Sequence, residues 1–174
     1  MYVLRRTLIT AAALLFTGCA SSETVPDHLE RDFRCTVNVT GERNYSAELE
    51  LVDNSGWNVK LTSPVSAEGI ELSYLSDGNR TLVVQGHTIV YTQKDIPDTG
   101  VFDLITSAAD MCIENKGVTV ENSGSSTVSK GEIRGMNFAA HAEKGSLTSI
   151  EIGGRIKAEF GYVPAKAVNN GSEE

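Results

Sequence analysis

The sequence is poor in the residues that carry most enzyme and metal chemistry. Its 174 residues include three histidines, three cysteines and one tryptophan. The histidines are scattered, without an H-E-x-x-H, C-x-x-C or EF-hand pattern, which argues against a metal site. No G-x-S-x-G, P-loop or dinucleotide-binding glycine pattern is present. We therefore expect no catalytic residue, no cofactor and no metal.

Runs of basic residues and long apolar stretches are also missing. The formal charge is −8, and no cluster of lysine and arginine offers a surface for nucleic acid phosphates. The apolar stretch 8–16 is shorter than the roughly 20 residues that a membrane-spanning helix needs. It follows Arg5 and Arg6, so residues 1–18 are typical of an export signal peptide.

A cysteine stands directly after this signal. The segment Leu15-Phe16-Thr17-Gly18-Cys19 resembles the bacterial lipobox, in which the cysteine receives diacylglyceryl and a further acyl chain such as palmitate. We favour lipidation of Cys19 over an ordinary signal with a chance cysteine. Two or more acyl chains anchor a protein stably. The mature chain is then expected on the extracytoplasmic face of the bacterial membrane, with residues 19–31 as a flexible tether and a charge of −10 after Arg5 and Arg6 are removed.

The following residues, 32–163, read as one domain dominated by strands. Apolar and polar residues alternate, and turn signals recur at intervals of roughly 8–12 residues, as in an antiparallel meander. The tail 164–174 is polar and expected to be disordered. The expected strands are 33–39, 45–51, 57–61, 70–74, 81–85, 87–92, 117–121, 127–134, 136–142, 147–152 and 155–160.

One helix interrupts these strands. Pro97-Asp98-Thr99 predicts its N-cap, and Lys116 with Gly117 predicts its end. The apolar stripe is Val101, Leu104, Ile105, Ala108, Met111 and Cys112, and the polar side is Asp103, Ser107, Asp110 and Glu114. About eleven strands and one helix predict a mainly β fold, an antiparallel half-barrel whose concave face is covered by the helix.

Cys35 and Cys112 both lie on apolar faces, so a disulfide between them is geometrically plausible in an oxidising compartment. The alternative, which we favour, is two separate buried thiols that act as small hydrophobic side chains. Cysteine connectivity does not follow from sequence.

A resemblance to a known family is carried by the lipobox, 33–37, 61–64, 69–74, Asp95-Ile96-Pro97, 131–135 and 149–152. Together these segments resemble the Lol-type (LolA/LolB-like) lipoprotein-carrier superfamily, particularly its lipid-anchored relatives in Firmicutes. The likeness covers residues 32–163. It implies a half-barrel with helical cover whose cavity, in the carriers, accepts the acyl chains of lipoproteins.

Two functions are compatible with this reading. The first is a non-catalytic, membrane-anchored protein that binds a lipid or acyl chain in its concave face. The second is a protein-interaction module that regulates or presents a cell-envelope enzyme, for example in sporulation or germination, by docking at open strand edges. Each cavity candidate can also simply fill the core, which we prefer for any single aromatic residue. The candidates are Val37, Leu49, Trp57, Leu61, Leu72, Tyr74 and Ile105.

Overall fold

The computed structural model describes residues 33–52, 56–75, 78–92 and 100–162, which form eleven strands, one α-helix and one short 3-10 helix. The elements are β1 (Phe33–Thr40), β2 (Tyr45–Val52), β3 (Gly56–Ser63), η1 (Val65–Ala67), β4 (Glu71–Leu75), β5 (Asn79–Val84), β6 (His87–Thr92), α1 (Val101–Ile113), β7 (Val118–Ser123), β8 (Ser126–Ile133), β9 (Met136–Glu143), β10 (Ser146–Ile152) and β11 (Ile156–Tyr162).

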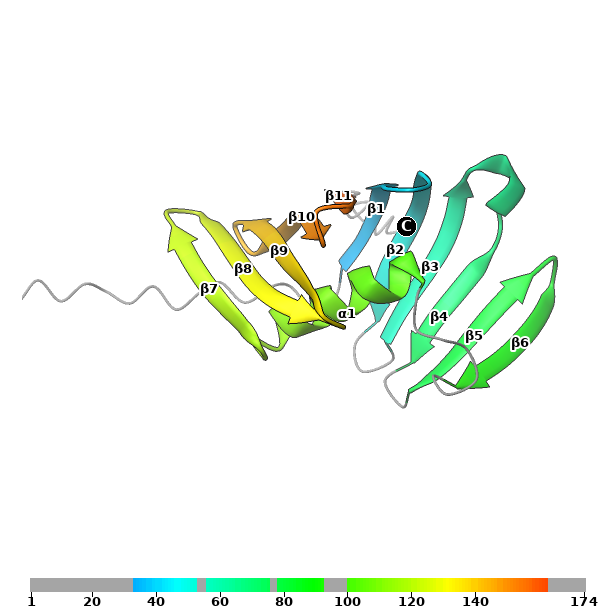
Figure 1. The fold of residues 1–174 in the computed structure, drawn as a ribbon. Helices are drawn as coiled ribbons and strands as arrows, with labels where there is room; N and C mark the ends of the chain where they lie inside the picture. Colours follow the sequence, from blue (N-terminus) through cyan, green and yellow to red (C-terminus); the bar gives the residue numbers. More distant parts are fainter. Residues whose placement is uncertain (1–32, 53–55, 76–77, 93–99, 163–174) are drawn as a thin grey trace, which may run out of the picture.

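All eleven strands belong to one open antiparallel sheet in the order β6-β5-β4-β3-β2-β1-β11-β10-β9-β8-β7. Pairing of β1 with β11 joins the two ends of the domain at the middle of the sheet, with Val37 opposite Phe160. Strands β6 and β7 are therefore the two edges. Helix α1 follows one edge strand and precedes the other, so the chain has to cross the whole sheet, and it does so over the concave face (Figure 1).

The alternation of residue types explains why one face of this sheet is dry. In β1, Cys35, Val37 and Val39 are buried, whereas the residues between them are exposed. The neighbouring strands continue the apolar row: Leu49 of β2 lies opposite both Cys35 and Val59. Side chains of a strand point alternately to its two faces, so this register places one apolar set on the concave side.

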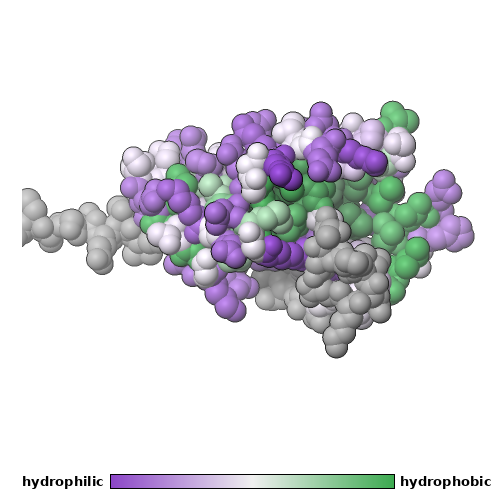
Figure 2. Space-filling model, viewed as in Figure 1, coloured by the Kyte–Doolittle hydropathy of each residue, from purple (hydrophilic) through white to green (hydrophobic). Residues whose placement is uncertain are grey.

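Helix α1 packs into the curve of the sheet. Ile105, Ala108 and Ala109 are fully buried against the strands, and the ring of Phe102 meets that of Tyr45 on β2 edge to face at 6.0 Å. The helix contacts β8, β9 and β10 as well. Figure 2 shows apolar surface on this side of the molecule beside the polar residues that rim it.

The structure corrects the predicted start of the helix. Its N-cap is Gly100, with no capping side chain, and the predicted cap Pro97-Asp98-Thr99 lies outside the described residues. Glycine is tolerated at an N-cap because it leaves the first backbone N–H groups accessible. At the other end, Asn115 and Gly117 adopt positive φ angles of 50° and 71°, which terminate the helix as the sequence predicts.

The expected fold class is confirmed: a mainly β, antiparallel half-barrel of eleven strands with one covering helix. Strand bounds agree with the predicted ones to within about two residues. The expected signal peptide 1–18, Cys19, the tether 19–31 and the tail 164–174 lie outside the described residues and remain predictions.

Candidate ligand-binding site

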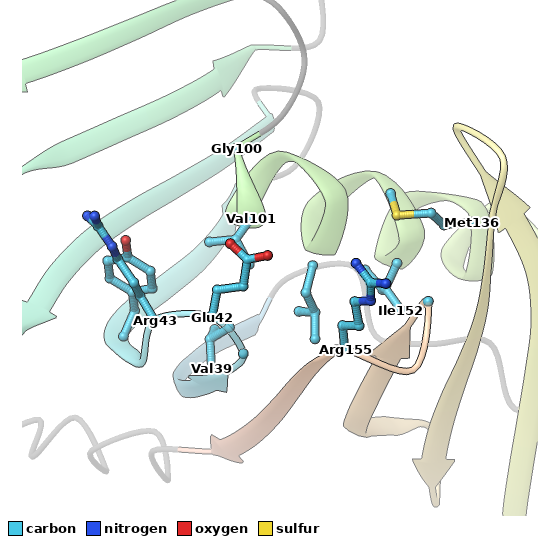
Figure 3. A pocket seen from close by; sticks show the side chains of 12 residues that line it. Val39, Glu42, Arg43, Gly100, Val101, Met136, Ile152 and Arg155 are labelled. Carbon is cyan, nitrogen blue, oxygen red and sulfur yellow. The ribbon is translucent and has the colours of Figure 1, made fainter.

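A cavity of about 650 Å³ opens beside the start of α1, where four parts of the chain meet (Figure 3). Its size lies within the range of small-molecule sites in proteins, about 300–1,000 Å³. Its walls come from the β1–β2 turn, the β10–β11 turn, the first residues of α1 and the start of β9. The lining residues are Val39, Gly41, Glu42, Arg43, Tyr45, Gly100, Val101, Met136, Ile152, Gly153, Arg155 and Ile156.

Pairing of β1 with β11 brings two of these turns together. A Cβ atom on Gly41 would lie 3.3 Å from the carbonyl oxygen of Arg155, so the β1–β2 turn needs glycine for its close approach to the β10–β11 turn. Gly153 in the β10–β11 turn has a φ of 59°, and a Cβ atom at this position would lie 3.6 Å from the sulfur of Met136. The site is thus held by turns attached to the central strands of the sheet.

The floor of the cavity is apolar and its rim is charged. Val39 and Ile152 are each 1% exposed, and Val101, Met136 and Ile156 are half-buried around them. These floor residues can bury an apolar chain, because none of them presents a charged group. The rim carries the exposed side chains of Glu42, Arg43 and Arg155.

The rim charges have no ion-pair partner among the described residues. Elsewhere, exposed charges pair across the sheet, as in Arg34 with Glu48 at 3.0 Å and Lys130 with Glu121 at 2.8 Å. Arg43, Arg155 and Glu42 belong to no such pair within the described part of the chain. Their charges are therefore available to a ligand at the mouth.

The residues predicted from sequence to line a cavity lie elsewhere. All seven belong to the hydrophobic core or pack against it, and none of them is among the lining residues of the cavity at the helix start. The five that are buried are Val37, Leu49, Trp57, Leu61 and Ile105, and the two that are half-buried are Leu72 and Tyr74. For the aromatic residues Trp57 and Tyr74, this is the core-filling alternative that we preferred from the sequence.

Two arginines hold a buried carboxylate of the helix. Asp103 is 3% exposed; its Oδ1 lies 2.6 Å from Nη2 of Arg80 on β5, and its Oδ2 accepts a hydrogen bond from Arg134 in the β8–β9 turn. Arg80 also lies over the ring of Tyr74, 5.3 Å from its centroid. One carboxylate thus connects α1 to strands on both sides of the central β1–β11 pair.

The sequence-based assignment of Asp103 and Asp110 to a solvated helix face was wrong. Because the sheet curves around α1, it reaches the polar side of the helix as well as the apolar stripe. Asp110 accepts a hydrogen bond of 2.7 Å from the indole Nε1 of Trp57. Burial is the main cause that raises the pKa of Asp110 to about 6. The hydrogen bond from Trp57 lowers this pKa, and the charge of Glu114 raises it.

Both described cysteines are free thiols: Cys35 is buried on β1 and Cys112 is half-buried on α1. Burial raises the pKa of Cys35 to about 12 and that of Cys112 to about 11. The structure agrees with the favoured alternative of two separate thiols rather than a disulfide.

In the described ranges, no group of three or more His, Cys, Asp and Glu side chains is placed to hold a metal ion. His87 is exposed on β6 and His141 is half-buried on β9. A search of the same ranges finds no helix that is long and apolar enough to cross a membrane.

No protein-family model matches the chain, and no curated protein matches its sequence.

Proposed function

We propose that this protein is a membrane-anchored extracytoplasmic lipoprotein that binds a hydrophobic ligand, a lipid or an acyl chain, without changing it chemically. The observation that carries this proposal is the cavity of about 650 Å³ with an apolar floor at the start of α1. The cavity lies on the domain that the sequence places behind a lipobox at Cys19. Membership of the Lol-type carrier superfamily is part of the same proposal, and the half-barrel with one covering helix supports it.

The binding energy comes from removing apolar surface from water. Each buried methylene contributes about 0.8 kcal/mol. An acyl chain against Val101, Met136 and Ile156, which are half-buried in the free protein, gains this energy without any specific polar contact, so the apolar lining alone selects for chains rather than for a particular ligand. The lipid on Cys19 keeps the binding domain at the membrane from which such ligands come.

Filling the cavity tests this proposal. The chain from residue 19 onward, with Cys19→Ser, keeps every described strand and the helix and carries no lipid of its own. We expect it to bind a fluorescent fatty acid one to one and to release the probe to unlabelled dodecanol. Val101→Trp places an indole in the cavity and should weaken binding at least about tenfold, as expected for a ligand that has lost much of its buried area.

Val120→Trp is the matched control, because Val120 is a half-buried residue of the edge strand β7 and does not line the cavity. This variant should bind the probe as the unsubstituted chain does. Absence of saturable binding by the unsubstituted chain, or equal binding by the Val101→Trp variant, contradicts the proposal.

A protein-interaction module is the second candidate, and the β6 edge favours it. Among the described strands, β6 pairs with β5 alone, and its Ile89 and Val90 are 53% and 66% exposed. It contains no Lys, Arg, Asp, Glu or Pro, the residues with which proteins commonly protect an open edge from strand addition. Val90→Lys should abolish capture of an envelope partner and leave probe binding intact if this second function holds.

The anchor is tested separately from the ligand. In a bacterial host, the unsubstituted full-length chain should fractionate with membranes and incorporate labelled palmitate, and Cys19→Ser should abolish both. Label on the Cys19→Ser variant, or membrane retention without any label, contradicts lipidation at this residue.

A further inference from the structure

We infer that the ligand of this cavity is an acyl amphiphile whose headgroup carries both a phosphate and an ammonium group, the chemistry of phosphoethanolamine and phosphocholine. This inference rests on the proposed function and adds the class of headgroup to it. It is carried by the three charged side chains at the rim, Glu42, Arg43 and Arg155.

The arginines at the rim differ from most basic residues of the domain. Six other bases have a carboxylate within 4.0 Å, namely Arg34, Lys60, Arg80, Lys130, Arg134 and Lys157. Arg43 and Arg155 have no such partner in the described ranges, although the chain has an excess of acidic residues, 23 against 15 basic ones. In the view of Figure 3 the guanidinium of Arg43 lies on the opposite side of the Glu42 carboxylate from that of Arg155. Each guanidinium is suited by itself to bind a phosphate, which arginine can contact through two N–H groups.

The rim also carries one negative charge. Glu42 precedes Arg43 in the β1–β2 turn, and Figure 3 shows its carboxylate directed toward the start of α1, over the same opening that the Arg155 side chain approaches from the β10–β11 turn. A purely anionic headgroup would leave Glu42 unpaired and repelled. In a headgroup with both a phosphate and an ammonium group, the phosphate can pair with a rim arginine and the ammonium with Glu42.

The apolar floor of the cavity favours a whole amphiphile over a free headgroup as the ligand. The floor residues Val39 and Ile152 lie beneath the charged rim and offer no hydrogen bond donor from their side chains. A phosphate placed there would lose its hydration without a partner. The head therefore stays at the mouth, and the acyl chain enters the cavity.

Three ligands with the same twelve-carbon chain test the inference: dodecylphosphocholine, dodecyl phosphate and dodecanol, each below the concentration at which it forms micelles. Titration into the chain from residue 19 onward, with Cys19→Ser, should give a Kd for dodecylphosphocholine about fivefold lower than for dodecanol, since exposed ion pairs each contribute modestly. Phosphocholine alone should not bind measurably.

Substitutions at the rim should change these ratios in different ways. Arg43→Gln with Arg155→Gln should remove the advantage of both phosphate ligands and leave the Kd of dodecanol unchanged. Glu42→Gln should weaken dodecylphosphocholine but strengthen dodecyl phosphate. Lys116→Gln is the matched control, because Lys116 is an exposed base that does not line the cavity; it should change no ratio.

The outcomes separate the two proposals. Equal binding of all three ligands, or ratios unaffected by the rim substitutions, overturns the headgroup inference and leaves the cavity as a site for chains. Tight binding of phosphocholine alone also overturns it, because the chain would then be irrelevant. Failure of all three ligands to bind overturns the proposed function and the inference with it.

Discussion

The indole of Trp57 on β3 donates a hydrogen bond of 2.7 Å from Nε1 to Oδ1 of Asp110 on α1. The residue is 2% exposed, so the bond satisfies a buried donor. It also holds a carboxylate partly out of water, which makes the attachment of the helix to the sheet sensitive to pH.

The pKa of Asp110 makes the fold more stable in mild acid. Burial raises it from an ordinary value of 3.8 to about 6 in the folded chain, so the folded state takes up a proton at a higher pH than the unfolded state. The contribution of Asp110 to the free energy of unfolding therefore falls as the pH rises from about 4 to about 6 and stays low above that.

We expect Asp110→Asn, which keeps an oxygen acceptor for Trp57, to raise the free energy of unfolding at pH 8 by about 1 kcal/mol, less than the full pKa shift because the carboxyl is only partly buried. At pH 4 the variant and the unsubstituted chain should agree. Urea unfolding at the two pH values measures this, and a stability difference independent of pH contradicts it.

Asp103 should contribute more to stability than any exposed ion pair of the sheet. Asp103→Asn leaves Arg80 and Arg134 without their shared counter-charge in a largely dehydrated place, so we expect a loss of about 3 kcal/mol in the free energy of unfolding. Glu121→Gln breaks the exposed pair with Lys130 and should cost less than about 1 kcal/mol. Equal effects of the two variants in denaturant unfolding would show that the arginines do not depend on Asp103.

Ile105→Asp tests the packing of the helix on the sheet. Ile105 is fully buried, and an unpaired charge at its position should lower the free energy of unfolding by several kcal/mol. Thr119→Asp adds the same charge at an exposed position of β7 and should change it by less than about 1 kcal/mol. Thermal unfolding of both variants measures the difference, and an unchanged Tm for Ile105→Asp contradicts the observed packing.

The architecture could be predicted from sequence because its signal is local. Alternation such as Cys35, Val37 and Val39 marks a strand with one dry face wherever it occurs, and positive-φ turns such as Arg134-Gly135 mark where strands reverse. The start of the helix was predicted too early because Asp98 and Thr99 are more favourable N-cap residues than glycine, but Gly100 precedes the first helical turn.

The site was harder to predict because it depends on contacts between distant segments. Glu42 and Arg155 are separated by more than a hundred residues and line the same cavity only because β1 pairs with β11. Each belongs to a turn that reads as solvated when taken alone. The burial of Asp103 was missed for a related reason: helical periodicity identifies the apolar side of a helix, but not how far a curved sheet reaches around it.

The two described thiols should be unreactive in the folded protein. Because burial raises the pKa of Cys35 to about 12 and of Cys112 to about 11, almost no thiolate is present at pH 8, and the thiolate is the species that reacts. In the chain from residue 19 onward with Cys19→Ser, we expect neither to react with iodoacetamide within minutes, and Cys112, the more exposed, to react first on longer incubation. After denaturation in urea, both should be labelled fully, as intact-protein mass spectrometry can show. Denatured chain that takes up label only after reduction would instead demonstrate a Cys35–Cys112 disulfide and contradict the free thiols.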